Sequence, residues 1–398
     1  MNNFIDKKVL IIICGGVAAY KSLELIRYLK KNRSEVKTIL TKSATKFVTK
    51  LSVSALSNEK VYTDLFDHKL ESEMSHIQLS RWADFILICP ATANTISKLS
   101  MGNADDLAST VVLASNKKIF IVPAMNVRMW EHTSNKQNIK KLKEYGYKFI
   151  GPEVGDMACG EYGQGKMVEP LYILKVLDNY LSQLKKNKKF KALVTAGPTI
   201  EAIDPVRFIS NHSSGKQGYE IAKSFSENGF DTTLISGPTQ IPKPDNVYTI
   251  NVVTANEMYE ETKKRLPVDV AVFAAAVTDF KVKNYQKKKI KKKIDLSLKL
   301  ELNKDILKFV SQNNFLRPKI VVGFAAETND LNSNSLIKLK EKNCDWIIGN
   351  DVRKKDTGFG SDYNKISLFY NGKIERFEKM HKASIADEIV ERLISELN

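Results

Sequence analysis

Apolar residues occur in short runs along the first half of the chain, separated by segments with apolar residues at helical spacing. VLIII (9–13) and VKTILT (36–41) have the length and composition of buried strands, and AAYKSLELIRYLKK between them has a helical period. The runs WADFILICP (82–90) and KKIFIVP (117–123) are two further strand candidates. Strands that alternate with helices are typical of a parallel sheet with helices on both faces.

The same pattern begins again in the second half. A helix is expected from about Gln217 to Asn228, and strand-like runs lie at 191–199, 231–239, 268–277, 319–327 and 344–351. SQLKKNKKFK (182–191) is polar and dense in lysine, which predicts a linker. The pattern as a whole predicts an α/β chain of two doubly wound, Rossmann-like domains, residues 1–185 and 186–398.

Composition excludes some classes of protein. No apolar run is long enough to span a bilayer, and the start of the chain, MNNFIDKKVLIIIC, lacks the layout of a secretion signal. The four cysteines are far apart and form no CxxC, which fits a reducing compartment. We therefore expect a cytoplasmic protein with no membrane partner.

The chain is basic, with 62 Lys and Arg against 45 Asp and Glu and a net charge of +17. A basic nucleic-acid-binding protein is one interpretation. The lysines are spread widely, however, and aromatic residues do not interleave with the basic runs. This distribution favours a solvated lysine-rich surface, part of which would serve phosphorylated small ligands.

Polar loops follow three of the expected strands in the first half. Gly15 and Gly16 let the backbone approach a ligand, and the helix behind them offers N–H donors to a phosphate. The spacing is not GxGxxG, so one phosphate, as in a mononucleotide, suits it better than a dinucleotide; a tight turn is the alternative. The later loops contribute Thr41, Ser43, Thr92, Asn94 and Thr95. Open α/β sheets bind ligands beyond the carboxyl ends of their strands, so we expect one site there.

Three isolated residues add candidate chemistry. VPAMNVRMW (122–130) presents Asn126 just after a strand, either as a helix cap or in an active-site loop. His76 lies near a helix start, where the dipole favours the neutral imidazole that a base requires, although such a histidine is more often structural. Cys159, in the glycine-rich ACGEYGQGKM, is either inert or able to close over a ligand and donate a proton.

The motifs of the first half resemble those of flavin-dependent phosphopantothenoylcysteine decarboxylases and occur in the same order. They are GGVAAYK, SHIQLSRWADF, PATANT, GNADDL, PAMNVRMW and ACGEYGQGKM. The resemblance implies an FMN-binding domain that assembles as trimers, with FMN at the subunit contacts. It implies that His76 is the base in oxidation of the cysteinyl thiol, that Asn126 binds the substrate carboxylate and that Cys159 protonates the ene-thiolate. Cys14 departs from the expected Thr, Gly or Ser.

The second half carries two basic features. RFISNHSSGKQG lacks the P-loop spacing, but Ser213, Ser214 and Gly215 stand at a helix start that suits an anion; a capped helix is the alternative. The run KVKNYQKKKIKKK (281–293) follows AAAVTDF, an expected strand that ends in Asp279. Such runs are usually solvated, but this one could fold over a triphosphate, with Asp279 on a ribose or on a metal such as Mg²⁺.

These features resemble phosphopantothenate–cysteine ligases of the bacterial, CTP-using type. The motifs are TAGPTIEAIDPVRFISNHSSGKQG, AAAVTDF, KIKK, NKDIL, GFAAET and IIGNDV, and the two activities are often fused in this order. The implied substrates are 4'-phosphopantothenate, CTP with Mg²⁺, and L-cysteine, joined through an acyl-cytidylate. Asn211 would hold that intermediate, Lys289 would neutralise the triphosphate, and Arg207 would meet a substrate phosphate or carboxylate. The implied nucleotide pocket comprises Asp279, Lys304, Asp305, Ile306, Leu307, Phe324, Lys338 and Lys342.

The resemblance also implies a homo-oligomer, a dodecamer in which trimers of the first half are joined by dimers of the second. Two alternatives stay open from the sequence: the nucleic-acid-binding protein, and a flavin prenyltransferase-like protein fused to an unrelated domain. Cys159 and the PAMN motif disfavour the second alternative.

Overall fold

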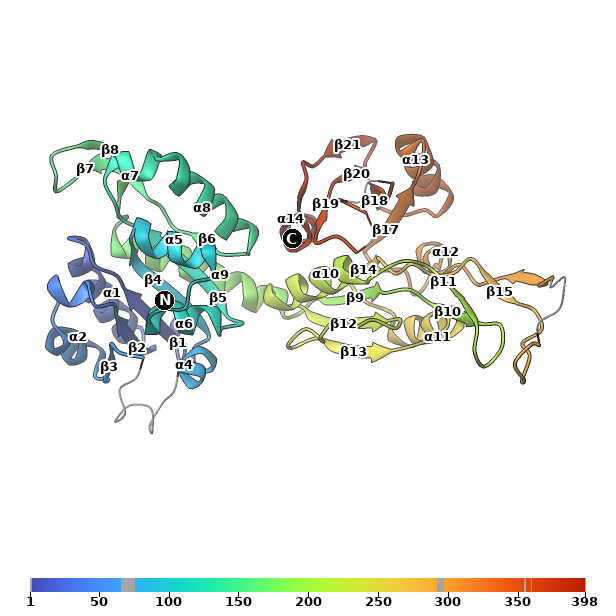
Figure 1. Cartoon of the computed structure of the whole chain (residues 1–398), viewed down its shortest axis with the longest axis horizontal. Coiled ribbons are helices and arrows are strands. Elements are labelled where there is room, and N and C mark those ends of the chain that lie inside the picture. Colours follow the sequence, from blue (N-terminus) through green and yellow to red (C-terminus); the bar gives the residue numbers. More distant parts are fainter. Residues whose placement is uncertain (1, 66–75, 292–296, 354–355, 359, 398) are drawn as a thin grey trace. The chain divides into compact units, whose positions relative to one another are not determined.

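The computed structural model describes residues 2–65, 76–291, 297–353, 356–358 and 360–397. Contacts within the chain divide it into two compact units, Met1–Gln183 and Leu184–Asn398, which are drawn in Figure 1. Each unit contains one large sheet of its own. The α/β architecture predicted from the alternating pattern is therefore confirmed in both halves.

The first unit is built on a six-stranded parallel sheet with the order β3-β2-β1-β4-β5-β6. The order reverses between β1 and β4, which both pair with their neighbours in parallel. This is the strand order of a doubly wound fold, whose ligands bind at the reversal. The strands are β1 (Lys8–Ile13), β2 (Glu35–Leu40), β3 (Val61–Tyr62), β4 (Phe85–Ala91), β5 (Lys118–Pro123) and β6 (Lys148–Phe149).

Helices cover both faces of this sheet. Leu10 and Ile12 of β1 point to a core formed with α4, α5, α6 and α8, while Ile11 between them is buried on the opposite face. Burial on both faces explains why the strands read as continuous apolar runs. The helices are η1 (Asn2–Phe4), α1 (Ala19–Lys31), η2 (Ala44–Lys46), α2 (Lys50–Ser57), α4 (His76–Trp82), α5 (Ala93–Met101), α6 (Leu107–Leu113), α7 (Val127–Glu131), α8 (Thr133–Glu144) and α9 (Pro170–Asn187).

The predicted linker at 182–191 is wrong for most of its length, because α9 continues to Asn187. The lysines of this segment lie on the solvent side of the helix, whereas Asn187 is buried and its amide donates a 2.9 Å hydrogen bond to the Asn228 carbonyl. Only residues 188–190 separate α9 from the next strand, β9 (Lys191–Ala196). The lysine density therefore marked a solvated helix face.

The second unit repeats the same strand order in an eight-stranded sheet, β13-β12-β9-β14-β17-β18-β20-β21. The strands from β13 to β18 are parallel, and β20 and β21 extend the sheet as an antiparallel hairpin. The order again reverses between two central strands, β9 and β14. The further strands are β12 (Asp231–Ser236), β13 (Tyr248–Asn251), β14 (Val270–Phe273), β17 (Ile320–Glu327), β18 (Trp346–Asp351), β20 (Ile366–Tyr370) and β21 (Lys373–Arg376).

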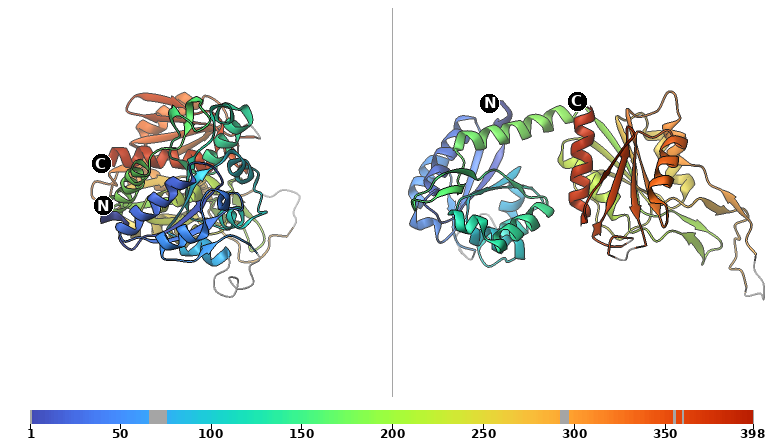
Figure 2. Two further views of the ribbon diagram at one scale, coloured as in Figure 1. Left: turned by 90° about the vertical axis from the view of Figure 1, so that its left-hand side faces the viewer. Right: turned by 90° about the horizontal axis from the view of Figure 1, so that it is seen from above.

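Alternate residues of these strands enter two separate cores. Val194 of β9 packs with α10 and α14, which cover one face as Figure 2 shows, and Leu193 packs with α11 and α12 on the other. The helices are α10 (Lys216–Glu227), α11 (Ala255–Arg265), α12 (Ile306–Ser311), α13 (Leu331–Glu341) and α14 (Lys382–Leu397). The helix expected at 217–228 is thus confirmed as α10.

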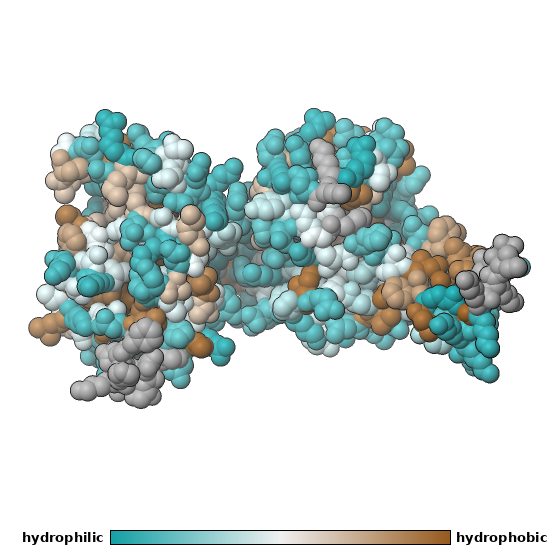
Figure 3. Space-filling model, in the orientation of Figure 1, coloured by the Kyte–Doolittle hydropathy of each residue, from teal (hydrophilic) through white to brown (hydrophobic). Residues whose placement is uncertain are grey.

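Within the described ranges, four two-stranded pairs lie outside the large sheets. They are β7 (Glu153–Asp156) with β8 (Tyr162–Lys166), β10 (Ile200–Ala202) with β11 (Phe208–Ser210), β15 (Phe280–Val282) with β16 (Leu300–Leu302), and β19 (Tyr363–Asn364) with β22 (Met380–His381). One face of the β15–β16 ribbon is apolar and exposed: Phe280 is 48%, Leu300 46% and Leu302 74% accessible. Figure 3 shows apolar surface gathered over this ribbon.

Candidate functional sites

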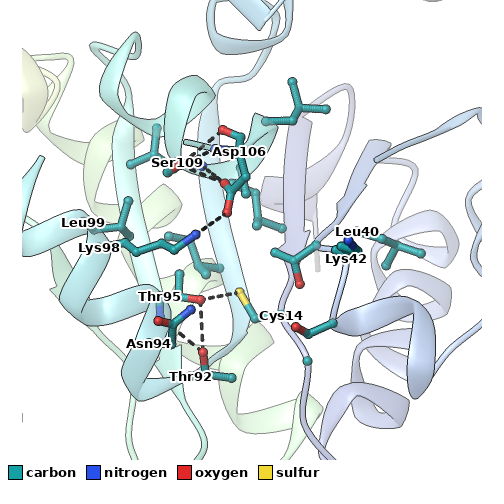
Figure 4. Close-up of a pocket in the computed structure, with 18 of the residues that line it drawn as sticks. Cys14, Leu40, Lys42, Thr92, Asn94, Thr95, Lys98, Leu99, Asp106 and Ser109 are labelled. Atoms are coloured by element: carbon teal, nitrogen blue, oxygen red, sulfur yellow. Dashed lines mark hydrogen bonds and ion pairs between the residues drawn. The ribbon is translucent and has the colours of Figure 1, made fainter. Parts of the chain in front are cut away.

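A cavity of about 740 Å³ opens at the carboxyl ends of the first sheet, beside the reversal between β1 and β4 (Figure 4). Its size lies within the range of about 300–1,000 Å³ that is usual for small-molecule sites. The loops after β1, β2, β4 and β5 all contribute to its wall, as expected of one shared site. Six of the predicted cofactor residues line it: Gly15, Thr41, Ser43, Thr92, Asn94 and Thr95.

The two glycines of the first turn have different surroundings. A Cβ on Gly15 would lie 2.4 Å from the Cβ of Ser43, so the close approach of the two loops requires glycine there. A Cβ on Gly16 would meet nothing within 4 Å. Gly16 does not line the cavity, although it was predicted as a cofactor residue.

The start of α5 is arranged around hydroxyl groups. Thr92 is the N-cap, and its Oγ1 accepts a 3.2 Å hydrogen bond from the Thr95 amide. The Thr95 hydroxyl in turn donates to the Cys14 sulfur at 3.2 Å. Burial raises the pKa of the Cys14 thiol to about 11, so this residue lines the cavity as a neutral group.

A charged cluster that the sequence analysis left without a role lies in the same cavity. The Lys98 ammonium is 2.8 Å from Asp105 and 3.0 Å from Asp106, and these two hydrogen bonds raise the pKa of Lys98. Burial acts to raise the pKa of Asp106, but the Ser109 amide and Lys98 outweigh it, so the pKa is lowered. Asp106 also forms a capping box with Ser109 at the start of α6. The motif GNADDL was the available signal for this cluster.

Both interpretations of the loop after β5 describe part of the structure. Asn126 is the N-cap of α7, and its Oδ1 accepts a 2.9 Å hydrogen bond from the Met129 amide. The neighbouring Met125 and Met129 line the cavity. Because the cap uses only Oδ1, the Nδ2 hydrogens of Asn126 remain chemically suited to a carboxylate.

His76 and Cys159 do not line the cavity of their own chain. His76 is the first residue of α4, as predicted, and is half-buried. Cys159 is exposed in the connection between β7 and β8, with its sulfur 3.7 Å from Glu161 Oε2. The described first unit therefore brings together the predicted cofactor loops, but not the predicted base and acid.

A second cavity, of about 560 Å³, lies at the carboxyl ends of β14 and β17 in the second unit. All eight residues predicted for the nucleotide pocket line it: Asp279, Lys304, Asp305, Ile306, Leu307, Phe324, Lys338 and Lys342. Asp305 caps α12 by accepting a 2.8 Å hydrogen bond from the Lys308 amide, and it forms an ion pair with Lys342. Residues from four separate segments thus meet in one site.

Lys338 is a half-buried cation of this cavity. Its ammonium donates a 2.8 Å hydrogen bond to the Phe324 carbonyl. Burial lowers the pKa of Lys338, and the neighbouring Lys342 lowers it further, although Glu327 opposes the shift. A cation held in this way is available to an incoming anion.

An adjoining cavity of about 350 Å³ shares Asp279, Phe324 and Lys338 with the second one. Its wall includes Asn211, whose Nδ2 donates a 2.9 Å hydrogen bond to the Ala276 carbonyl. The start of α10 also lines it through Ser213, Ser214, Gly215 and Lys216, where Gly215 adopts φ +81°. The predicted anion-binding helix start therefore adjoins the predicted nucleotide pocket.

Arg207 and Lys289 line neither cavity. The Arg207 guanidinium is bound to Asp204 at 2.6 Å and to the Ile290 carbonyl at 2.7 Å. Lys289 is exposed on the lysine run, whose residues 292 and 293 lie outside the described residues. The predicted contact of Arg207 with a substrate thus competes with contacts inside the chain.

Among the described residues, no group of three or more His, Cys, Asp or Glu side chains is arranged to hold a metal ion. Asp279 and Asp305 are the carboxylates that line the second cavity. The helices of the described ranges include none that is long and apolar enough to cross a membrane.

Comparison with known proteins assigns both units. A family model described as Flavoprotein matches residues 3–182, and one described as DNA/pantothenate metabolism flavoprotein C-terminal domain matches residues 187–397. The chain is thus a flavoprotein-type α/β unit joined to a second unit of that C-terminal type. This match contradicts the alternative in which the second half is an unrelated domain.

Relatives that match over nearly the whole chain identify its family. The coenzyme A biosynthesis bifunctional protein CoaBC of Haemophilus influenzae is 42% identical over 390 residues, which is 98% of this chain and 97% of the relative. The protein of the same description from Escherichia coli is 38% identical over 396 residues, with 97% of each chain covered. A crystal structure of the C-terminal domain of such a protein is 33% identical and covers 53% of this chain and 98% of that one, with a TM-score of 0.45. The chain belongs to the CoaBC family of bifunctional coenzyme A biosynthesis proteins.

Proposed function

We propose that this chain catalyses two consecutive reactions of coenzyme A biosynthesis. The second unit ligates L-cysteine to 4'-phosphopantothenate with CTP, and the first decarboxylates the product, 4'-phosphopantothenoylcysteine, to 4'-phosphopantetheine with FMN. The observation that carries the proposal is the placement of one motif-lined cavity at the strand-order reversal of each unit, in a chain that belongs to the CoaBC family over nearly its full length. The corresponding domains would be residues 1–185 and 186–398.

The first cavity has the chemistry that FMN requires. Hydroxyls of Ser43, Thr92 and Thr95 suit a phosphate or ribityl chain, and Ile88, Leu99 and other apolar residues suit a flat ring system. FMN, when bound, supplies the two-electron oxidation of the cysteinyl thiol and the later return of those electrons. His76 would accept the thiol proton, Asn126 would donate hydrogen bonds to the substrate carboxylate, and Cys159 would return a proton to the ene-thiolate.

The lysine-lined cavity of the second unit suits a nucleoside triphosphate. Lys304, Lys338 and Lys342 would stabilise the phosphates, with Mg²⁺ carried by CTP and held in part by Asp279. The carboxylate of phosphopantothenate would attack the α-phosphate and release pyrophosphate. Asn211, in the adjoining cavity, would hold the acyl-cytidylate while the cysteine amine displaces CMP. Mixed-anhydride activation is needed because a bare carboxylate is a poor acyl donor.

Two features support a homo-oligomer. His76 and Cys159 lie outside the cavity of their own chain, so a neighbouring copy would have to bring them to it. The exposed apolar face of the β15–β16 ribbon is the second feature, since a two-stranded ribbon is marginally stable without a partner. Trimers through the first unit and dimers through the second would give the dodecamer expected from the resemblance.

The experiment that tests both halves uses the purified full chain. An absorbance spectrum, with mass spectrometry of whatever heat releases, should show stoichiometric FMN. Pyrophosphate should then form only when CTP, cysteine and 4'-phosphopantothenate are all present, and carbon dioxide should follow. Protein that stays colourless after FMN is added would refute the decarboxylase assignment, and absence of pyrophosphate would refute the ligase assignment independently.

A further inference from the structure

The lysine run after β15 is fastened to the turn between β10 and β11. The amide of Gln286 donates a 3.2 Å hydrogen bond to the Ile203 carbonyl. The amide of Ile290 donates to Asp204 Oδ2 at 3.0 Å, and the Ile290 carbonyl accepts from the Arg207 guanidinium at 2.7 Å. Segments some 83 residues apart in the sequence are thus joined by three hydrogen bonds at two points.

Asp204 is the centre of this arrangement. Its side chain is 0% exposed, and it accepts five hydrogen bonds: from the amides of Val206, Arg207 and Ile290, and from two nitrogens of the Arg207 guanidinium. Burial acts to raise the pKa of Asp204, but the Ile290 amide and the other donors hold it well below its ordinary value. An ionised carboxylate with this many donors is a rigid attachment point.

The attachment connects two predicted catalytic groups. Lys289 immediately precedes Ile290, and Asn211 immediately follows β11 of the same hairpin. The Asn211 amide is in turn bound to the Ala276 carbonyl beside the nucleotide cavity. The turn of the hairpin therefore binds the lysine run at Gln286 and Ile290, and Asn211 follows the second strand of the same hairpin.

We propose that Asp204 is a positioning residue for the ligase reaction: it fixes the backbone at Ile290, so that the exposed side chain of Lys289, which lines neither cavity, extends from a fixed point towards the triphosphate of bound CTP. The role rests on the proposed function, because it presupposes that CTP is the substrate. Arg207 is part of the same attachment, through its contacts with Asp204 and the Ile290 carbonyl. Asp204 and Arg207 both bind the backbone of Ile290, which lies outside the β10–β11 hairpin. This contact distinguishes the proposed role from general stabilisation of the hairpin.

Asp204→Asn tests the proposal with little change in volume. The carbonyl oxygen of the new side chain can still accept hydrogen bonds from the backbone amides of Val206 and Arg207. Its NH₂ group, however, would face the Arg207 guanidinium and the Ile290 amide, which are donors too. In isothermal titrations of the full chain with Mg²⁺–CTP, we expect affinity to fall about 10- to 100-fold, as for loss of a hydrogen bond to an ionised group. Hydrogen exchange at Ile290 should become faster in the same variant, without nucleotide.

A double-mutant comparison with Lys289 separates a positioning role of Asp204 from a general effect of Asp204 on the stability of the protein. In a Lys289→Gln background, Asp204→Asn should change CTP affinity by less than about threefold, because the contact it serves is already lost. Arg207→Lys, which retains the charge, should show a smaller loss with the same coupling. Glu301→Gln, which removes the 3.3 Å ion pair with Lys281 on the neighbouring ribbon, is the matched control and should leave affinity unchanged.

The outcomes distinguish a failure of the positioning role of Asp204 from a failure of the proposed ligase function. Equal losses in the wild-type and Lys289→Gln backgrounds, or unchanged exchange at Ile290, would overturn the positioning role while ligation by the wild type stands. A Lys289→Gln variant with wild-type CTP affinity would also overturn it. A wild type that forms no pyrophosphate from CTP would overturn the proposed ligase function itself.

Discussion

Replacing Gly15 by alanine examines whether the turn after β1 and the loop after β2 form one side of the FMN site. The new Cβ would lie 2.4 Å from Ser43 Cβ and 2.7 Å from the Ser43 carbonyl carbon. Non-bonded carbons prefer separations of about 3.5–4.0 Å, so the loops must separate by roughly 1 Å. Overpacking of this kind costs about 1–3 kcal/mol, which corresponds to about a 5- to 150-fold loss of FMN affinity if the ligand needs the native spacing.

The assay should report stability and binding separately. Thermal unfolding of the flavin-free protein should shift downward by about 2–12 °C, given about 2–4 °C per kcal/mol for a unit of this size. Quenching of flavin fluorescence during titration gives the affinity. Gly16→Ala is the matched control, because its Cβ would meet nothing within 4 Å, and it should not change the melting temperature. If Gly15→Ala melts like the wild type, or Gly16→Ala is equally destabilised, the steric argument is refuted. If Gly16→Ala retains full FMN affinity, Gly16 is not a cofactor residue.

Three further predictions concern the catalytic groups and the assembly. His76→Asn should lower decarboxylation by about 10²–10⁴-fold and leave ligation intact, because a general base contributes that much; loss of both activities in coupled assays would contradict separate sites. Because the pKa of Lys338 is lowered, its ammonium is lost at a lower pH than an ordinary lysine, so the KM for CTP should rise as pH increases through that pKa, and Lys338→Arg should flatten the rise in a pH series. Leu300→Asp on the exposed ribbon should reduce the assembly to smaller oligomers in light scattering, whereas Lys281→Ser on the opposite face should not; an unchanged mass for Leu300→Asp would exclude the ribbon as an interface.

The strands and the main helices could be predicted because both sheets are covered on both faces. The resulting apolar runs, such as 9–13 and 268–277, stand out against polar loops. The end of α9 could not be predicted, since its lysines are typical of either a linker or a solvated helix, and only the tertiary contact of Asn187 with Asn228 distinguishes them.

Contacts between side chains on different helices and loops also could not be predicted from the sequence. The pairing of Lys98 with Asp105 and Asp106 crosses from one helix to the cap of the next, so no fixed helical spacing describes it. The contacts of Arg207 within the chain also could not be predicted: one partner, Asp204, is three residues away, and the other, the Ile290 carbonyl, is 83 residues away. The contact of Arg207 with a substrate, which the family resemblance implies, stays a prediction. Long-range pairs of this kind are fixed by the fold.

The two units combine the same strand order with cavities of different charge. Both cavities open at the carboxyl ends beside a reversal, where neighbouring loops diverge. Among the described residues, two lysines and three aspartates line the first cavity, and Lys98 is already paired twice. Of the residues that the structure describes, four lysines and two aspartates line the second cavity, where Lys304 and Lys342 are each paired with one carboxylate. The second balance suits the proposed triphosphate better than the first, because cations in a partly enclosed cavity attract polyanions strongly. The difference between the two sites therefore lies in the side chains of the loops, and the sheets supply the same platform to each.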